Sequence, residues 1–65
     1  MKFKNVEKDR TYISTTNFGI FKKGDKVIVT TVRNLGTEVI LELENEKGKV
    51  DSLKGKLEDK VKLFK

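Results

Sequence analysis

The stretch Phe21-Lys-Lys-Gly-Asp-Lys-Val-Ile-Val-Thr-Thr-Val-Arg33 decides the fold of this chain. In it, a basic segment that contains a glycine leads directly into a run of valine, isoleucine and threonine. Branched residues of this kind favour β-strands, so residues 26–33 are predicted to form a strand. Residues 37–44 alternate apolar and polar side chains and are predicted to form the next strand.

The alternation also predicts how these two strands pair. A loop of three residues, 34–36, keeps the apolar faces of both strands on the same side of the sheet. This loop places Val29 opposite Leu41 and Lys26 opposite Glu44. We therefore expect a tight hairpin in which valine and leucine side chains form the centre of the core.

The size and composition of the chain limit how it can be stabilised. A chain of 65 residues buries only about 60% of the surface of its unfolded state. It has no cysteine and no histidine, so we expect no disulfide, no metal site and no cofactor. Apolar side chains must provide the stability, which favours a sheet closed into a barrel. No apolar run approaches the length of a membrane span and no secretion signal is recognised, so we expect a soluble cytoplasmic protein without membrane contact.

The chain is predicted to consist of a short arm and one domain. Residues 1–10 show no consistent periodicity and are interpreted as a loosely docked N-terminal arm. Residues 11–65 are interpreted as a single domain. It begins with a short strand over residues 11–16, followed by a long bent loop over residues 17–25 that contains two glycines.

The C-terminal half completes the expected sheet. A four-residue loop at 45–48 leads into a strand whose apolar side chains change phase, so we expect a bulge near Asp51 or Ser52. Residues 56–60 predict a 3-10 turn, and residues 61–63 predict the closing strand. The predicted fold class is therefore all-β, a small five-stranded barrel with a 3-10 turn before the last strand.

This strand order and one short motif resemble the SH3-like small barrels. The motif is Lys23-Gly-Asp-Lys-Val-Ile-Val29, which is similar to the start of a KOW-type module, where Gly-Asp precedes a valine-rich strand. The likeness in strand order covers residues 20–63, whereas the motif covers only the stretch just quoted. Many such barrels bind RNA, DNA or transcription and translation factors, so the resemblance implies an SH3-like fold and a binding function within that range.

The composition does not favour catalysis. Without histidine and cysteine, the most frequent general bases and nucleophiles are missing. The glutamates of residues 38–46 alternate along a predicted strand, which is typical of a solvated face and not of an acid–base pair or a calcium loop. We therefore expect a protein that is not an enzyme and has no catalytic residues.

The excess positive charge lies in the first half of the chain. The net charge is +5; residues 1–33 contain eight Lys/Arg against three Asp/Glu, and residues 34–65 contain seven of each. This asymmetry favours an anionic partner, and lysines around a glycine turn suit phosphate groups. A solvated lysine-rich surface explains the same pattern. With only two arginines, we expect contact with a nucleic-acid backbone without base-specific reading. The candidate nucleic-acid-binding residues are Lys22, Lys23, Lys26, Lys4, Arg10 and, as a stacking platform, Tyr12.

A second function class fits the sequence as well. A small chain of this composition is typical of an adaptor or inhibitor, encoded by a phage or mobile element, that binds a host protein. Three branched residues of the two central strands are predicted to lie on the other face of the sheet from the core valines. There, either residues 11–16 cover them or a partner docks on them. A monomer is favoured over a dimer. The candidate protein-interaction residues are Ile28, Val32, Ile40, Glu38 and Glu42.

Overall fold

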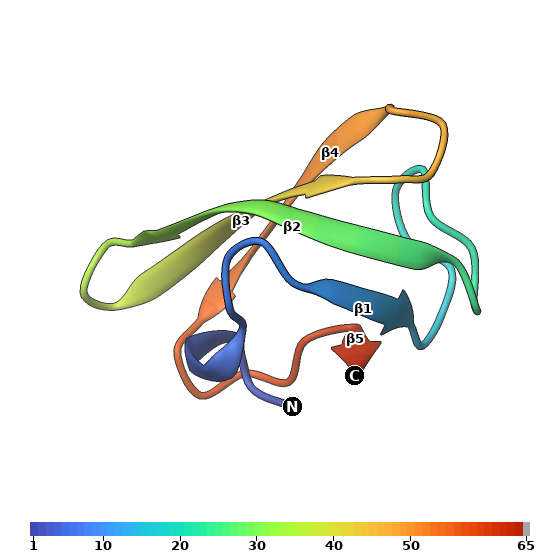
Figure 1. The fold of residues 1–65 in the computed structure, drawn as a ribbon. Helices are drawn as coiled ribbons and strands as arrows, with labels where there is room; N and C mark the ends of the chain where they lie inside the picture. The colour runs from blue at the N-terminus through green and yellow to red at the C-terminus, as the bar shows by residue number, and fades with distance from the viewer. Residues whose placement is uncertain (65) are drawn as a thin grey trace.

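The longest strand of the protein lies at the centre of its sheet. The computed structural model describes residues 1–64, and its elements form an antiparallel sheet in the order β4-β3-β2-β1-β5 (Figure 1). The predicted all-β class is therefore confirmed. The elements are the 3-10 helix η1 (Phe3–Asn5) and the strands β1 (Thr11–Ser14), β2 (Lys26–Asn34), β3 (Glu38–Glu44), β4 (Val50–Lys56) and β5 (Leu63–Phe64).

The sheet is open, so the prediction of a closed barrel is wrong. Within residues 1–64, β4 and β5 lie at opposite edges and do not pair with each other. The four strands β1–β4 have four residues or more, whereas β5 is reduced to two residues and is too short to close the sheet. The helix η1 lies beside the end of β4 instead. The N–H groups of Phe3 and Lys4 donate to the carbonyl groups of Asp59 and Leu57 at 3.0 and 3.1 Å.

The 3-10 element lies at the N-terminus and not before the last strand, where it was predicted. Residues 56–59 form a turn in which the N–H of Asp59 donates to the carbonyl of Lys56 at 3.0 Å. The carboxylate of Asp59 accepts a hydrogen bond from the N–H of Lys56 at 3.1 Å. This side-chain contact satisfies the backbone N–H of the turn locally, and no further helical turn follows.

No helix in the described part of the chain is long and apolar enough to cross a membrane.

The hairpin of β2 and β3 is present, but its predicted register is wrong. Val29 pairs with Leu43 and not with Leu41. The chain turns later than predicted, because β2 continues through Asn34 and the turn lies at residues 35–38. In this turn, the N–H of the first residue donates to the carbonyl of the last residue at 2.8 Å.

The later turn and a β-bulge at Thr30 together set the register, because without the bulge the pairing of Asn34 with Val39 would place Val29 opposite Glu44. The pairing shifts between Val29 and Thr31, so Thr30 has no partner residue of its own, and its hydroxyl donates to the carbonyl of Glu42 at 3.2 Å. The extra residue reverses the alternation beyond it, and Val32 therefore packs against the core. In a run made only of valine, isoleucine and threonine, the apolar pattern does not reveal such a residue.

The strands β3 and β4 pair regularly along the whole of β4, so the bulge predicted near Asp51 or Ser52 is wrong. The irregularity lies in the loop before the strand. The N–H of Asn45 donates to the carbonyl of Lys49 at 2.9 Å, and Gly48 adopts a φ of 81°. A left-handed glycine at this place is the first residue of a G1 bulge, and it sets the phase of β4 before the strand begins.

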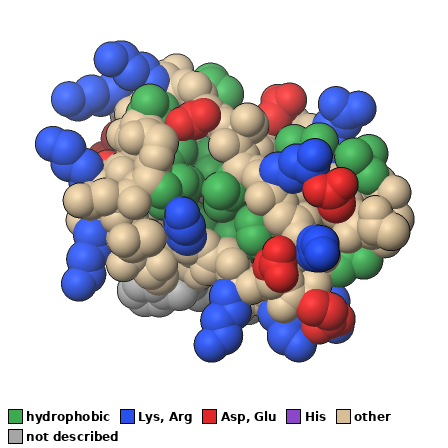
Figure 2. All heavy atoms as spheres, turned by 180° about the vertical axis from the view of Figure 1, so that it is seen from behind, with side chains coloured by type: hydrophobic (Ala, Val, Ile, Leu, Met, Phe, Trp, Pro, Cys, Tyr) green, Lys and Arg blue, Asp and Glu red, His purple; other side chains and the backbone are tan. Residues whose placement is uncertain are grey.

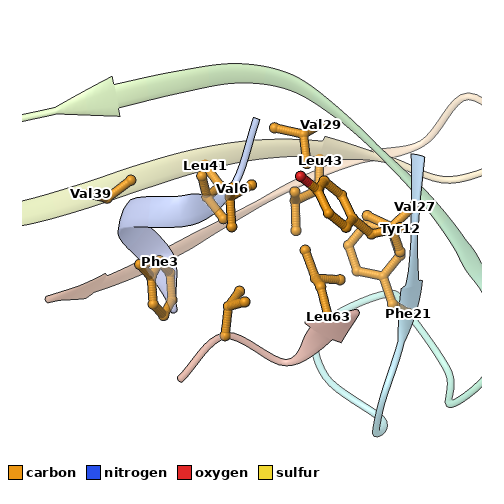
Figure 3. Packing of buried hydrophobic residues seen from close by; sticks show 11 residues of the cluster. Phe3, Val6, Tyr12, Phe21, Val27, Val29, Val39, Leu41, Leu43 and Leu63 are labelled. Carbon is orange, nitrogen blue, oxygen red and sulfur yellow. The ribbon is translucent and has the colours of Figure 1, made fainter. Parts of the chain in front are cut away.

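The core lies on one face of the sheet, with Phe3 at one end and with Tyr12 and Phe21 at the other (Figure 3). The valines and leucines predicted to share the inner faces of β2 and β3 are buried, whereas Thr31, predicted on the same face, is only half-buried because it follows the bulge. The buried apolar residues are Phe3, Val6, Tyr12, Phe21, Val27, Val29, Val39, Leu41, Leu43, Val61 and Leu63.

Residues 1–10 contribute to this core, so the loose docking expected for them is not observed. Phe3 and Val6 are only 4% and 6% exposed. The ring of Phe3 lies against Gly55 of β4, where a side chain would leave no space for it. The N-terminal segment, and not a long fifth strand, therefore covers this end of the core.

Candidate functional site

The long loop between β1 and β2 is held together by its own backbone. At its base, the N–H of Ser14 donates to the carbonyl of Asp25, and the N–H of Gly24 donates to the carbonyl of Ser14, both at 2.9 Å. At its tip, Phe18 and Phe21 exchange both backbone hydrogen bonds, at 3.0 and 2.8 Å. The loop is therefore a small hairpin that fixes the basic residues after its tip.

The tip of this loop docks on the start of β4. Gly19 has a φ of 52°, and a Cβ atom at this position would collide with the carboxylate of Asp51. The N–H of Ile20 donates to Oδ2 of the same carboxylate at 3.3 Å. Because β4 begins directly after the β3–β4 loop, the two loops lie at the same end of the molecule (Figure 1).

A single asparagine shapes the β3–β4 loop. Oδ1 of Asn45 accepts hydrogen bonds from the N–H groups of Lys47 and Lys49, both at 2.9 Å. The N–H of Gly48 donates to the Asn45 carbonyl at 3.1 Å. These bonds hold the backbone of the loop in one tight turn, and this turn positions Lys47.

A cleft of about 390 Å³ lies between the two loops. Lys22 and Lys26 line it from the β1–β2 loop and the start of β2, and Lys47 lines it from the other loop. Figure 2, which views the molecule from behind, shows basic side chains projecting at the end where these loops lie. The full lining is Ile20, Lys22, Asp25, Lys26, Asn45, Glu46 and Lys47.

The lysines at this cleft are exposed, and none of the ion pairs formed within residues 1–64 involves them. The Asp25 carboxylate accepts a hydrogen bond from the backbone N–H of Lys22 at 2.9 Å and so caps the turn. Lys26 lies opposite Ile13, and Glu44 lies opposite Ile28. The predicted pairing of Lys26 with Glu44 is therefore wrong. In the described part of the chain, no group of carboxylates is arranged to hold a metal ion. The cleft therefore offers three ammonium groups to an anion, beside the carboxylates of Asp25 and Glu46.

Lys4 and Arg10, which were predicted to join this surface, lie elsewhere. Lys4 belongs to η1, which Figure 1 shows at the opposite end of the sheet from the two loops. Lys2 and Lys4 each contact the Glu58 carboxylate at 2.7 Å, and their hydrogen bonds lower its pKa from the ordinary 4.5 to about 2. Arg10 pairs with Glu7 at 3.0 Å. Both candidates are thus already engaged with carboxylates.

Tyr12, the predicted stacking platform, is completely buried in the core. Its hydroxyl accepts a hydrogen bond from the N–H of Glu7 at 2.9 Å, and its ring packs among apolar side chains (Figure 3). A base has no access to it. Phe18 is partly buried and packs on Phe21 with ring centroids 5.2 Å apart, while the Lys62 ammonium lies 5.8 Å from the Phe18 centroid.

The surface predicted for protein interaction is not continuous. Ile28 is 38% exposed and Ile40 is half-buried, but Val32 packs against the core because of the bulge in β2. The strand β1 pairs with the edge of β2 and does not cover its outer face. Glu38 and Glu42 lie on β3, which has a strand on each side and offers no edge to a partner.

Lys47 is a cleft residue that sequence reasoning did not identify. It lies in the half of the chain whose charges balance, far in sequence from the basic stretch. The signal that could have found it is the predicted hairpin itself. In antiparallel pairing, the start of β2 lies beside the end of β3, so the loops attached to these two ends must be neighbours.

Comparison with protein-family models, with curated proteins and with solved structures finds no match to this chain. The functional argument therefore depends on the geometry and charge of the cleft.

Proposed function

We propose that this chain is a small non-catalytic module that binds the phosphate backbone of nucleic acid with little sequence preference. The contact surface is the cleft between the β1–β2 loop and the β3–β4 loop. The observation that supports this most directly is the convergence of Lys22, Lys26 and Lys47 from two separate loops on one cleft. Lys23, the residue after Lys22, is also exposed, and we include it in the proposed contact surface.

The chemistry of the cleft suits contact with the phosphate groups of a nucleic acid and does not suit the reading of its bases. Ammonium groups on flexible stems act as point charges that adapt to successive phosphates, and they carry no fixed geometry for reading bases. Neither of the two arginines lines the cleft, so the bidentate contact that reads guanine is not available there. Binding is therefore expected to depend on charge and salt and to be almost independent of sequence.

We also propose that the fold is related to the SH3-like barrels in spite of its open sheet. The strand order supports this relationship, because a three-strand meander is followed by a last strand that returns to β1. The KOW-like stretch, residues 23–29, runs from the basic loop into β2 and so includes one side of the cleft. The relationship and the binding site thus depend on the same part of the chain.

The proposal is tested by fluorescence anisotropy with labelled single-stranded and duplex oligonucleotides at low salt. With three lysines in contact, the plot of log K against log salt should have a slope of about −2 to −3. The variant K22E/K26E/K47E should lose binding. The matched control K8E/K56E/K60E changes the net charge equally with exposed lysines outside the cleft, and it should keep most of the affinity.

Absence of binding at low salt, or binding that salt does not weaken, would contradict the proposal. In that case, capture of a stoichiometric protein from a nuclease-treated bacterial lysate would favour the adaptor or inhibitor class instead. Equal loss in both triple variants would show that only the net charge matters and that the cleft is not the site.

A further inference from the structure

The hydrogen-bonding groups of β4, an edge strand of the sheet, can be assigned from its loop. The N–H of Asn45 donates to the carbonyl of Lys49, so this pair is of the hydrogen-bonded type. In an antiparallel ladder the two types of pair alternate, so every second residue of β4 directs both its N–H and its carbonyl away from β3. These outward residues are Val50, Ser52, Lys54 and Lys56.

Carboxylates occupy half of these outward donors. The N–H of Ser52 donates to Oδ1 of Asp51 at 2.8 Å. The N–H of Lys56 donates to Oδ2 of Asp59 at 3.1 Å. The remaining outward donors have no such side-chain cap within residues 1–64. An edge strand with unpaired groups is a template for another strand, and here it is partly covered by the chain itself.

We propose that the β4 edge is a pairing surface for a second copy of this chain, and that Asp51 and Asp59 keep it closed. Each carboxylate removes one donor from the edge. It also places negative charge where the carbonyl oxygens of an incoming strand would lie. The inference is independent of the lysine cleft, because none of the outward residues of β4 lines that cleft.

The sequence of β4 suits antiparallel pairing with itself about Leu53. In this register, the outward residues of the two copies face one another as hydrogen-bonded pairs, and Leu53 faces its own equivalent on the inner side. Leu53 is only partly buried in the single chain, so it has apolar surface to contribute there. The facing pairs are Ser52 with Lys54 and Val50 with Lys56. In each pair, one of the two hydrogen bonds needs a donor that a carboxylate already holds, and the Lys56 carbonyl, which already accepts from the N–H of Asp59, would accept a second bond.

The test is analytical ultracentrifugation of the full chain over a wide range of concentrations. The variant D51A/D59A should form a dimer with an association constant at least about tenfold above that of the unmodified chain, because each restored hydrogen bond contributes to pairing. The control E42A/E46A removes the same charge from residues that cap no strand N–H, and it should sediment as the unmodified chain does.

A proline locates the interface. Replacing Lys54 by proline in the D51A/D59A background removes an outward donor without loss of a bond to β3, so it should abolish the dimer. If circular dichroism shows that D51A/D59A is unfolded, the single variant D59A is measured instead, since it leaves the contact between Asp51 and Ile20 intact. This variant should dimerise more strongly than the unmodified chain, but by less than the tenfold expected when both donors are restored. A folded variant that remains as monomeric as the control, or a dimer that survives Lys54→Pro, would overturn the proposal.

Discussion

The ring of Phe3 lies on the backbone of Gly55 so closely that a Cβ atom at Gly55 would be 2.6 Å from Phe3 Cζ. This contact closes the core between η1 and β4, at an end that no other strand within residues 1–64 covers. Gly55→Ala is expected to push the ring out of its site and to lower the free energy of unfolding by about 1–3 kcal/mol. Urea denaturation followed by circular dichroism measures this loss.

A double-mutant cycle identifies the cause of that loss. Phe3→Leu leaves a smaller and more flexible side chain above Gly55, so Gly55→Ala should cost less in this background. An equal cost in both backgrounds would mean that the collision with the ring is not what destabilises the variant.

Tyr12 is predicted to matter for stability and not for binding. Tyr12→Phe removes the acceptor of the Glu7 N–H and should lower the free energy of unfolding by about 1–2 kcal/mol. The affinity for oligonucleotides should not change, because the ring is fully buried. Anisotropy and urea denaturation on the same preparation separate the two effects. A folded variant with clearly weakened binding would restore the stacking role to this residue.

The alternation of apolar residues was enough to predict the buried side chains of β3 and of β2 up to Val29, but not the packing of Val32 beyond the bulge or the cross-strand partners. Val29 and Leu41 are buried as predicted, because a period of two sends alternate side chains to the same face. With the turn at residues 35–38, the register depends instead on the unpaired Thr30, and the phase of β4 depends on the left-handed Gly48. Neither is visible in the pattern of apolar residues, because the first lies within a uniformly branched run and the second lies in a loop.

The candidate site was predictable only where it is local in sequence. Lys22 and Lys26 lie close together in the chain, and the structure places both at one cleft. Lys4 is a candidate by charge alone, but burial of Phe3 fixes the N-terminal segment at the other end of the sheet (Figure 1). Lys47 was not predicted, because it is far from Lys22 and Lys26 in the sequence and only the pairing of β2 with β3 brings it close to them.

Glu58 is expected to make stability depend on acid pH. Its pKa is lowered from 4.5 to about 2 by Lys2 and Lys4. A carboxyl group with a lowered pKa in the folded state stabilises that state above its ordinary pKa. This contribution is lost as the pH falls from about 4.5 to about 2. A direct measurement is the NMR titration of the Glu58 carboxyl carbon, which should show a midpoint near 2.

Two variants serve as controls for this titration. In K2A/K4A, the midpoint of Glu58 should return toward its ordinary value. In Glu58→Gln, the part of the acid dependence between pH 4.5 and 2 that this group contributes should disappear from denaturation curves. High salt should reduce the effect in the unmodified chain, because the three side chains are exposed. A midpoint that stays near 4.5 in the unmodified chain is the outcome that contradicts this prediction.

Lys47 and Lys49 provide a matched pair of residues for testing the cleft. Both belong to the same loop, and both donate a backbone N–H to Asn45, but only Lys47 lines the cleft. Lys47→Glu should weaken oligonucleotide binding and reduce the salt slope by about one, since it removes one phosphate contact. Lys49→Glu changes the net charge equally and should leave that slope almost unchanged. Anisotropy titrations at several salt concentrations compare the two variants. If both reduce the slope to the same extent, the phosphate contacts are spread over the whole loop and are not confined to the cleft.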